Sequence, residues 1–282
     1  MRTFLHRLAC LLAMAALPGC GGDPSASASD AGAPDERPSI VSLNPCADAI
    51  LAEIAAPGQL LAISHYSHAP RSASMPLGEA RRFPATGGTA EEVLALAPDI
   101  VVADSFLAPS THRALQSAGI RVERLGIAST LGESQEHIRQ LGAAIDRKAA
   151  ARALSSRVDA AWNESPPAGD PPTALLIQEG DIVPGPQSLA HALLERAGFT
   201  SLSAARGLGQ GAHVPLERVL ADPPDIVIAA GGGRMLGHPV LRSLPDMPRT
   251  TLDPTLLYCA GPTIPRALER LRAIRRSVQA NR

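Results

Sequence analysis

One short segment of this chain has residue types that could coordinate a metal. His65-Tyr66-Ser67-His68 places two imidazoles and a phenol within four successive residues. A zinc site needs three or four nitrogen, oxygen or sulfur ligands, and the other histidines do not fall at places that would complete such a set. A site for bare Zn²⁺ or Mn²⁺ therefore stays open as an alternative, and we expect no bound metal ion of this kind.

Enzymatic patterns are weak in this sequence. An exported α/β hydrolase would show Gly-x-Ser-x-Gly after a strand, and the chain contains none. The glycine-rich segments 207–211 and 231–233 lack the downstream acid that completes a dinucleotide-binding fingerprint. No nucleophile and base are clustered. We therefore expect no enzymatic activity and no cofactor, and keep an exported α/β enzyme as a second alternative.

An internal repeat organises the chain. Residues 91–103 and 217–229 are identical at nine of thirteen positions, 126 residues apart. In each copy a short helix ends before a proline, which cannot continue it. An aspartate then leads a run of β-branched residues, which is typical of a buried parallel strand. The repeat indicates two similar α/β lobes.

The segments around the repeat alternate between strands and helices, which predicts parallel sheets. The first lobe, 39–132, has expected strands at 39–43, 60–63 and 120–125 and helices at 47–54 and 110–118. In the second lobe, 165–282, we expect a strand at 173–178 and a helix at 188–197. Gly119 and Gly198 end the helices that precede them. The predicted fold class is α/β, with two parallel-sheet lobes joined by a long helix.

The connection between the lobes, 133–164, contains a proline-free stretch from Glu133 to Trp162 that is rich in Ala, Arg, Glu and Gln. Its apolar residues recur at helical spacing. They predict either one long helix or two helices with a break near residues 142–147. A helix of ~17 residues would span about 25 Å and act as a rigid strut. Trp162 is expected to lie in the core.

Two cysteines, Cys46 and Cys259, lie far apart in the sequence, and each is near a loop expected to face a cleft between the lobes. Spacing alone defines no disulfide framework. A bridge across the cleft would block its opening. We therefore expect free or buried thiols.

The N-terminus has the pattern of an export signal. Arg2 and Arg7 precede ten apolar residues, 8–17, which is about half of what a membrane-spanning helix needs. Leu17-Pro18-Gly19-Cys20 resembles the lipobox of bacterial lipoproteins. The resemblance implies removal of signal peptide 1–19, acylation of Cys20 and a periplasmic, membrane-anchored location. Residues 20–38, rich in Gly, Pro, Ser, Ala and Asp, are expected to form a disordered tether.

Charge restricts the class of partner. The formal net charge is −1 and aromatic residues make up only 2% of the chain. A near-neutral charge gives no reason to expect a nucleic acid partner. We expect a monomer.

Several segments, taken in their order along the chain, resemble segments of the substrate-binding proteins of ABC importers for cobalamin, ferric siderophores and heme. The matching segments are 37–43, 64–70, 89–103, 188–198, 215–229 and 261–282. The resemblance implies a periplasmic receptor that captures a bulky metal chelate between two lobes and delivers it, after a small hinge motion, to a permease dimer with a cytoplasmic ATPase. A structural lipoprotein that binds no ligand is a third alternative.

The ligand is then expected at loops that follow the carboxyl ends of the strands. The candidate ligand-binding residues are Asn44, His65, Tyr66, His68, Arg71, Asp104, Phe106, Gln178, His213, Arg234 and Tyr258. An anionic ferric chelate would require arginine, which Arg71, Arg81, Arg82 and Arg234 could supply. The low aromatic content differs from cobalamin receptors, so corrinoid, siderophore and heme all stay open.

In the same family each lobe presents a glutamate to one permease subunit. The matching positions are Glu91 and Glu217, which occupy the same place in the repeat. A glutamate in a first helical turn also complements the helix dipole without any partner. Thr89 and Glu92 form the pattern of a capping box, which accounts for Glu92 without a function.

Overall fold

The computed structural model describes residues 37–232, 239 and 247–280. The predicted signal peptide, Cys20, most of the tether and Arg234 lie outside the described residues. In the part of the chain that is described, no helix is long and apolar enough to cross a membrane.

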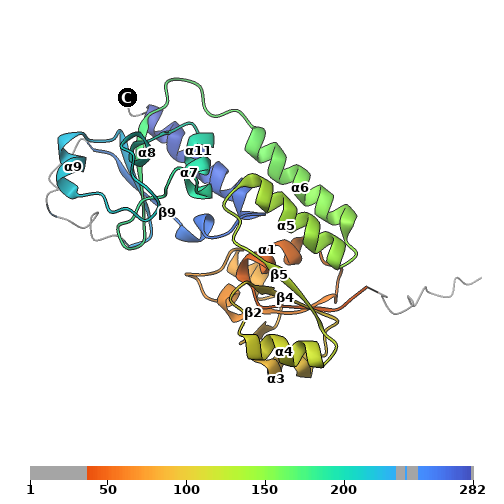
Figure 1. The fold of residues 1–282 in the computed structure, drawn as a ribbon. Helices are drawn as coiled ribbons and strands as arrows, with labels where there is room; N and C mark the ends of the chain where they lie inside the picture. The colour runs from red at the N-terminus through yellow and green to blue at the C-terminus, as the bar shows by residue number, and fades with distance from the viewer. Residues whose placement is uncertain (1–36, 233–238, 240–246, 281–282) are drawn as a thin grey trace, which may run out of the picture. The chain divides into compact units, whose positions relative to one another are not determined.

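The first lobe is a parallel sheet of five strands in the order β3-β2-β1-β4-β5 (Figure 1). The strands are β1 (Ile40–Ser42), β2 (Leu60–Ser64), β3 (Ala85–Thr86), β4 (Ile100–Asp104) and β5 (Arg121–Leu125). The helices are α1 (Pro45–Ile54), α2 (Leu77–Ala80), α3 (Ala90–Leu96) and α4 (Pro109–Ser117), and a single helical turn covers His65–His68.

The second lobe is a parallel sheet in the order β7-β6-β8-β9. Its strands are β6 (Thr173–Gln178), β7 (Thr200–Ser201), β8 (Ile226–Ala230) and β9 (Arg249–Leu252). The described helices are α7 (Leu189–Arg196), α8 (Leu202–Ala205), α9 (Leu216–Ala221) and α11 (Thr263–Ala280), with a helical turn at Pro254–Leu257. Two parallel-sheet α/β lobes confirm the predicted fold class.

The two copies of the repeat make the same hydrogen bonds just before β4 and β8. Asp99 accepts hydrogen bonds from the backbone N–H and the hydroxyl of Ser39, both at 2.7 Å. Asp225 accepts the same pair of bonds from Thr173, at 2.7 and 2.9 Å. Each aspartate thus fixes the register of the neighbouring strand, and the bonds from Ser39 lower the pKa of Asp99.

Alternating residues of the central strands divide the apolar interior into separate cores. Ile100 and Val102 of β4 belong to the largest core, while Val101 belongs to a smaller one on the opposite face of the sheet. In β6, Leu176 belongs to the same largest core, while Leu175 faces a third. One continuous core therefore covers one face of both sheets.

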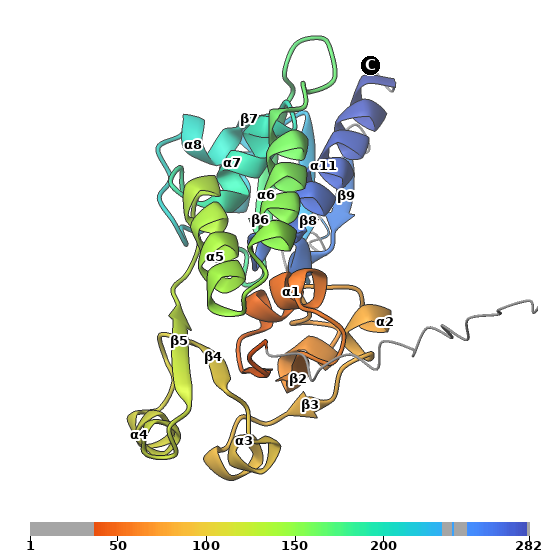
Figure 2. The same cartoon turned by 90° about the vertical axis from the view of Figure 1, so that its right-hand side faces the viewer.

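Two helices, α5 (Leu131–Ala144) and α6 (Lys148–Asn163), connect the lobes. They lie side by side (Figures 1 and 2) and contribute Ile138, Leu141 and Leu154 to the shared core. The structure therefore has the second of the two arrangements that we considered, and the single long helix is wrong. The reason is local, because Asp146 adopts a positive φ of 55° in the turn, which reverses the chain.

Close packing of the pair depends on Gly142, because a Cβ atom there would overlap the Cβ of Ala151. Gln135 of α5 also donates to the carboxylate of Asp159 on α6 at 2.7 Å. At the far end, Arg272 of the buried α11 donates to the backbone carbonyls of Ala161 and Glu164, at 2.9 and 2.8 Å. The two connecting helices are thus packed against each other, and the end of α6 is also bonded to α11. Trp162 is partly buried against the shared core.

Candidate functional site

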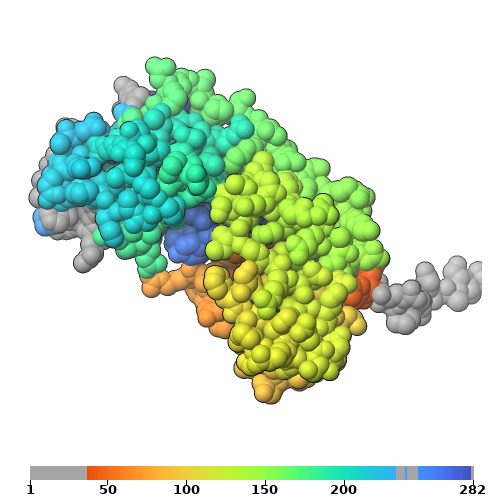
Figure 3. Space-filling model, viewed as in Figure 1, coloured from red at the N-terminus to blue at the C-terminus, as the bar shows by residue number. Residues whose placement is uncertain are grey.

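Three pockets that share residues form one cleft, whose floor is formed by the C-terminal part of the chain (Figure 3). We call the pocket of about 360 Å³ beside α1 the central pocket. The pocket of about 630 Å³ beside the start of α7 is the α7 pocket, and the pocket of about 270 Å³ beside β2 is the β2 pocket. Tyr258 lines the first two and Asp104 lines the first and third.

The cleft lies where the strands end. The residues that follow β2, β4 and β5 line it from the first lobe, and Gln178 at the end of β6 lines it from the second. In parallel sheets the carboxyl ends of the strands meet at one edge, so their loops converge there. The segment Tyr258–Gly261, just before α11, completes the central pocket.

Seven of the predicted ligand-binding residues line these pockets. They are Asn44, His65, Tyr66, Asp104, Phe106, Gln178 and Tyr258. The side chain of Asn44 is nevertheless occupied, because its oxygen accepts from the backbone N–H groups of Cys46 and Ala47 at 2.8 and 3.2 Å and caps α1.

The structure does not bring His68, Arg71 or His213 into the lining of these pockets. His68 Nε2 lies 3.1 and 3.2 Å from the carbonyl oxygens of Ala80 and Phe83. Arg71 forms an exposed ion pair with Glu179 of the second lobe at 3.4 Å. Arg234 lies outside the described residues.

Sequence reasoning missed two lining residues of note, Ile127 and His137. Ile127 follows the predicted strand 120–125, so the rule that found the other loops applies to it as well. His137 lies in the middle of α5, and only the packing of that helix turns it toward the central pocket.

Large apolar side chains that are exposed to solvent gather in the cleft. Tyr66, Phe106, Ile127 and Tyr258 are 53%, 79%, 76% and 45% exposed, and all four line the pockets. Elsewhere in the described residues the exposed large apolar side chains are Leu94 and Leu96 of α3. Concentration of apolar surface at a concave site is typical of ligand binding.

Two imidazoles in the cleft can offer a nitrogen lone pair. His65 Nδ1 lies 3.2 Å from the carbonyl oxygen of Thr86, which can only accept a hydrogen bond, so in the neutral imidazole Nε2 offers the lone pair. Burial lowers the pKa of His137, which favours its neutral form. Among the described residues no three His, Cys, Asp or Glu side chains come together to hold a metal ion.

The turn that carries His65 and Tyr66 is anchored from below by a buried carboxyl group. Asp48 of α1 is fully buried, and its Oδ2 accepts from the Ser64 N–H at 3.0 Å and the Ser67 hydroxyl at 2.6 Å. Its buried Oδ1 accepts no hydrogen bond of normal geometry from the described residues. Burial raises the pKa of Asp48 to about 7, although the hydrogen bonds oppose the rise.

The expectation of free thiols is wrong, because Cys46 and Cys259 form a disulfide with a Cα–Cα distance of 5.2 Å. Both cysteines line the central pocket. The bridge lies where α1 and α11 already share the largest core, through Ile50 and Ile264. It therefore joins segments that packing holds together, and does not span the mouth of the cleft as we assumed.

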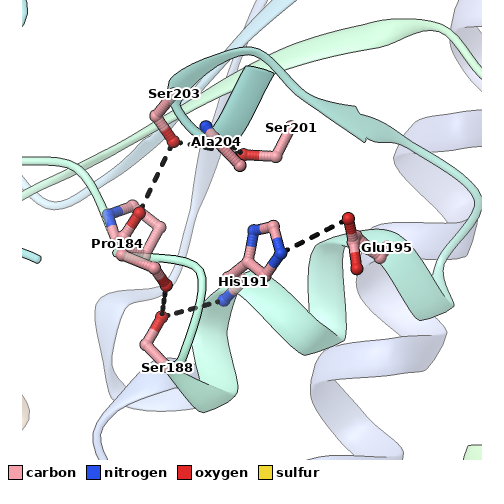
Figure 4. A network of polar contacts seen from close by, with 8 residues as sticks. Pro184, Ser188, His191, Glu195, Ser201, Ser203 and Ala204 are labelled. Atoms are coloured by element: carbon pink, nitrogen blue, oxygen red, sulfur yellow. Dashed lines mark hydrogen bonds and ion pairs between the residues drawn. The ribbon is translucent and has the colours of Figure 1, made fainter. Parts of the chain in front are cut away.

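The wall of the α7 pocket is held by a network of polar contacts (Figure 4). The Ser188 hydroxyl accepts from the His191 N–H at 3.2 Å and donates to the Gly185 carbonyl at 2.7 Å. His191 Nε2 lies 3.3 Å from a carboxylate oxygen of Glu195. Gln210 accepts from the Gly185 N–H at 2.8 Å, which fixes the loop on its other side.

The two glutamates of the repeat are exposed. Glu91 lies in the first turn of α3 and Glu217 in the first turn of α9. Glu92 does not complete the predicted capping box: its backbone N–H donates to the Thr89 hydroxyl at 3.2 Å, but its carboxylate accepts from the Thr86 hydroxyl and the Gly87 N–H instead. A complete capping box occurs at Thr130 and Glu133.

The sequence profile of the periplasmic binding protein family matches residues 40–245. This chain belongs to that family, which confirms the resemblance found in the sequence. A search of curated protein sequences finds no match.

Solved structures give the same fold. The periplasmic heme-binding protein RhuT from Roseiflexus sp. RS-1 superposes with a TM-score of 0.67 at 21% identity, over 86% of this chain and 98% of its own. The heme-binding protein HutB of Vibrio cholerae gives 0.66 at 19%, over 84% and 98%. The vitamin B12-binding protein BtuF of Vibrio cholerae gives 0.59 at 19%, over 86% and 98%.

Removal of the disulfide is expected to destabilise the protein. Its loss in the double variant Cys46→Ser/Cys259→Ser should lower the free energy of unfolding by about 2–5 kcal/mol, because the bridge restricts the unfolded chain. Urea denaturation of the oxidised protein, the reduced protein and the variant measures this. The reduced protein and the double variant should have the same free energy of unfolding. Two titratable thiols in residues 37–282 purified without reductant would contradict the assignment, because Cys46 and Cys259 are the cysteines of that segment.

Asp48 should make stability depend on pH. Its pKa is about 7 in the folded protein, against 3.8 for an unperturbed aspartate, so the folded state binds the extra proton between these values. The unfolding free energy should therefore fall as pH rises from 4 to 7, by up to about 4 kcal/mol from this residue. Asp48→Asn keeps an oxygen for Ser64 and Ser67 and should lose this part of the pH dependence. The unfolding free energy of both proteins is measured by urea denaturation at several pH values. The same dependence on pH in the two proteins would refute the assignment.

Proposed function

We propose that this protein is the substrate-binding component of an ABC importer, which captures a bulky metal chelate in the cleft and delivers it to the permease. The observation that carries the proposal is the gathering of Tyr66, Phe106, Ile127 and Tyr258, exposed and apolar, around one cleft in a periplasmic binding protein fold. Such side chains suit the faces of a large ligand, and His65 and His137 are placed where they could approach its metal.

The similar solved structures support a chelate as the ligand. RhuT and HutB are described as heme-binding and BtuF as vitamin B12-binding. Family membership supports binding without catalysis and an extracytoplasmic location. A monomeric state is part of the proposal. Anchoring through acylated Cys20 is part of the proposal and rests on the sequence alone.

Docking to the permease dimer is proposed to use Glu91 and Glu217. Both carboxylates are exposed, occupy equivalent places in the two lobes, and form no hydrogen bond or ion pair within the described part of the chain. Unpaired carboxylates remain available to a basic partner, and such contacts steer association. The exposed Leu94 and Leu96 on α3 add apolar surface near Glu91.

Ligand binding tests the function directly. Residues 37–282, which form one compact unit, should show a thermal shift with one chelate class among cyanocobalamin, heme and ferric siderophores. Occupancy at 100 times Kd should add about 2.7 kcal/mol of stability. Phe106→Ala/Tyr258→Ala should reduce the shift. No shift with any chelate would refute the proposal, and a shift with Zn²⁺ or Mn²⁺ alone would support the bare-metal alternative.

Docking is tested by charge reversal. Glu91→Lys/Glu217→Lys should abolish uptake of the chelate by cells that depend on this protein, because both lobes would repel the basic partner, while the Kd for the chelate stays unchanged. Glu269→Lys is a matched control, since Glu269 is an exposed glutamate of α11 outside the repeat. Normal uptake by the double variant would eliminate this docking mode.

A further inference from the structure

The described lining of the cleft has almost no formal charge. Among the described residues the three pockets are lined by no lysine or arginine, and the single carboxylate is that of Asp104. Asp104 lies at the end of β4, where the central pocket meets the β2 pocket, and its Oδ1 accepts from the Phe106 N–H at 2.7 Å. The hydrogen bond fixes the carboxylate beside the exposed ring of Phe106.

The described arginines that could serve an anionic ligand lie outside the lining of the three pockets, although Arg71 and its partner Glu179 are close enough to Tyr258 to shift the pKa of that phenol in opposite directions. Arg71 is paired with Glu179. Arg82 is exposed and paired with Glu79 at 2.6 Å, and Arg81 is exposed as well. None of the three lines a pocket of the cleft. The expectation that these three arginines hold an anionic chelate is therefore not supported by their positions.

The polar side chains that line the described part of the cleft are mostly uncharged. The pockets are lined by the hydroxyl or amide groups of Ser105, Ser129, Gln178, Gln187, Ser188 and Gln210. Among the described residues the side chains of Ser105, Gln178 and Gln187 form no hydrogen bond, so they are available to a ligand. Hydroxyls and carboxamides pair well with ligand amides and hydroxamates, which both donate and accept.

Electrostatics then decides which chelates fit. A carboxylate or catecholate brought into this lining loses water without gaining a cationic partner, which is costly. Asp104 adds repulsion between like charges, and such repulsion is a recognised source of selectivity. An uncharged or cationic chelate avoids both the uncompensated loss of anion hydration and the repulsion from Asp104.

We propose that the cleft selects an uncharged or cationic chelate with apolar faces and an amide or hydroxamate periphery, rejects polyanionic chelates, and uses Asp104 as the discriminating residue. This inference rests on the proposed function and narrows it to one substrate class.

Two matched probe pairs test the selection on residues 37–282 by calorimetry at fixed ionic strength. The first pair is dicyanocobinamide and the corrin heptacarboxylate, which share a ring and differ in peripheral charge. The second is a cationic ferric trihydroxamate and a trianionic ferric tricatecholate. In whichever pair binds, the uncharged or cationic member should bind at least about tenfold more tightly, or about 1.4 kcal/mol. The preference should shrink as salt is raised.

Asp104→Asn should reduce the preference severalfold, because the amide oxygen can still accept from Phe106 while the repulsion is gone. Glu269→Gln removes a charge outside the cleft and should leave the preference unchanged. Equal or tighter binding of the anionic members would overturn the inference and leave the receptor function standing. An unchanged preference in Asp104→Asn would overturn the role of Asp104. Failure of all four probes, heme and cyanocobalamin would refute the receptor function itself.

Discussion

The continuous apolar core on one face of both sheets is the constraint on which the other features depend. Alternate residues of β4 and β6 enter it, and α1, α5, α6, α7 and α11 complete it. Because a strand presents successive residues to opposite faces, one face of each sheet is committed to this core and the other to a smaller one. The two lobes are therefore joined by burial of apolar surface, and the disulfide between Cys46 and Cys259 lies at the edge of that junction.

This junction also determines where the cleft opens. With one face of each sheet buried in the common core, the carboxyl ends of the strands from both lobes converge on the segment Tyr258–Gly261. The walls are then held by contacts below the surface. Asp48 anchors the turn with Tyr66, and Ser188, Gly185 and Gln210 hold the opposite loop. The cleft is thus largely formed before any ligand enters, which limits the entropy lost on binding.

The chemistry of the cleft follows from what this framework exposes. Large aromatic and aliphatic side chains are exposed in the cleft, uncharged polar groups line it with them, and Arg71 and Arg82 are paired with glutamates. Under the proposed function, shape and hydrogen bonding would therefore contribute more to recognition than charge does. The glutamates proposed for docking lie in the first turns of α3 and α9, outside the lining of the cleft.

The sequence by itself determined the two α/β lobes, because the repeated Pro-Asp-Ile-Val segments carry local information: proline ends a helix, and Asp99 and Asp225 fix the adjacent strand. It also indicated the loops with Tyr66, Asp104 and Gln178, since loops after parallel strands must converge. Only the tertiary structure decided the rest. The turn at Asp146 separates two helices that share one periodicity. The disulfide between Cys46 and Cys259 joins residues 213 positions apart. The orientations of His137 and Arg71 depend on packing between distant segments, and no local sequence pattern encodes such packing.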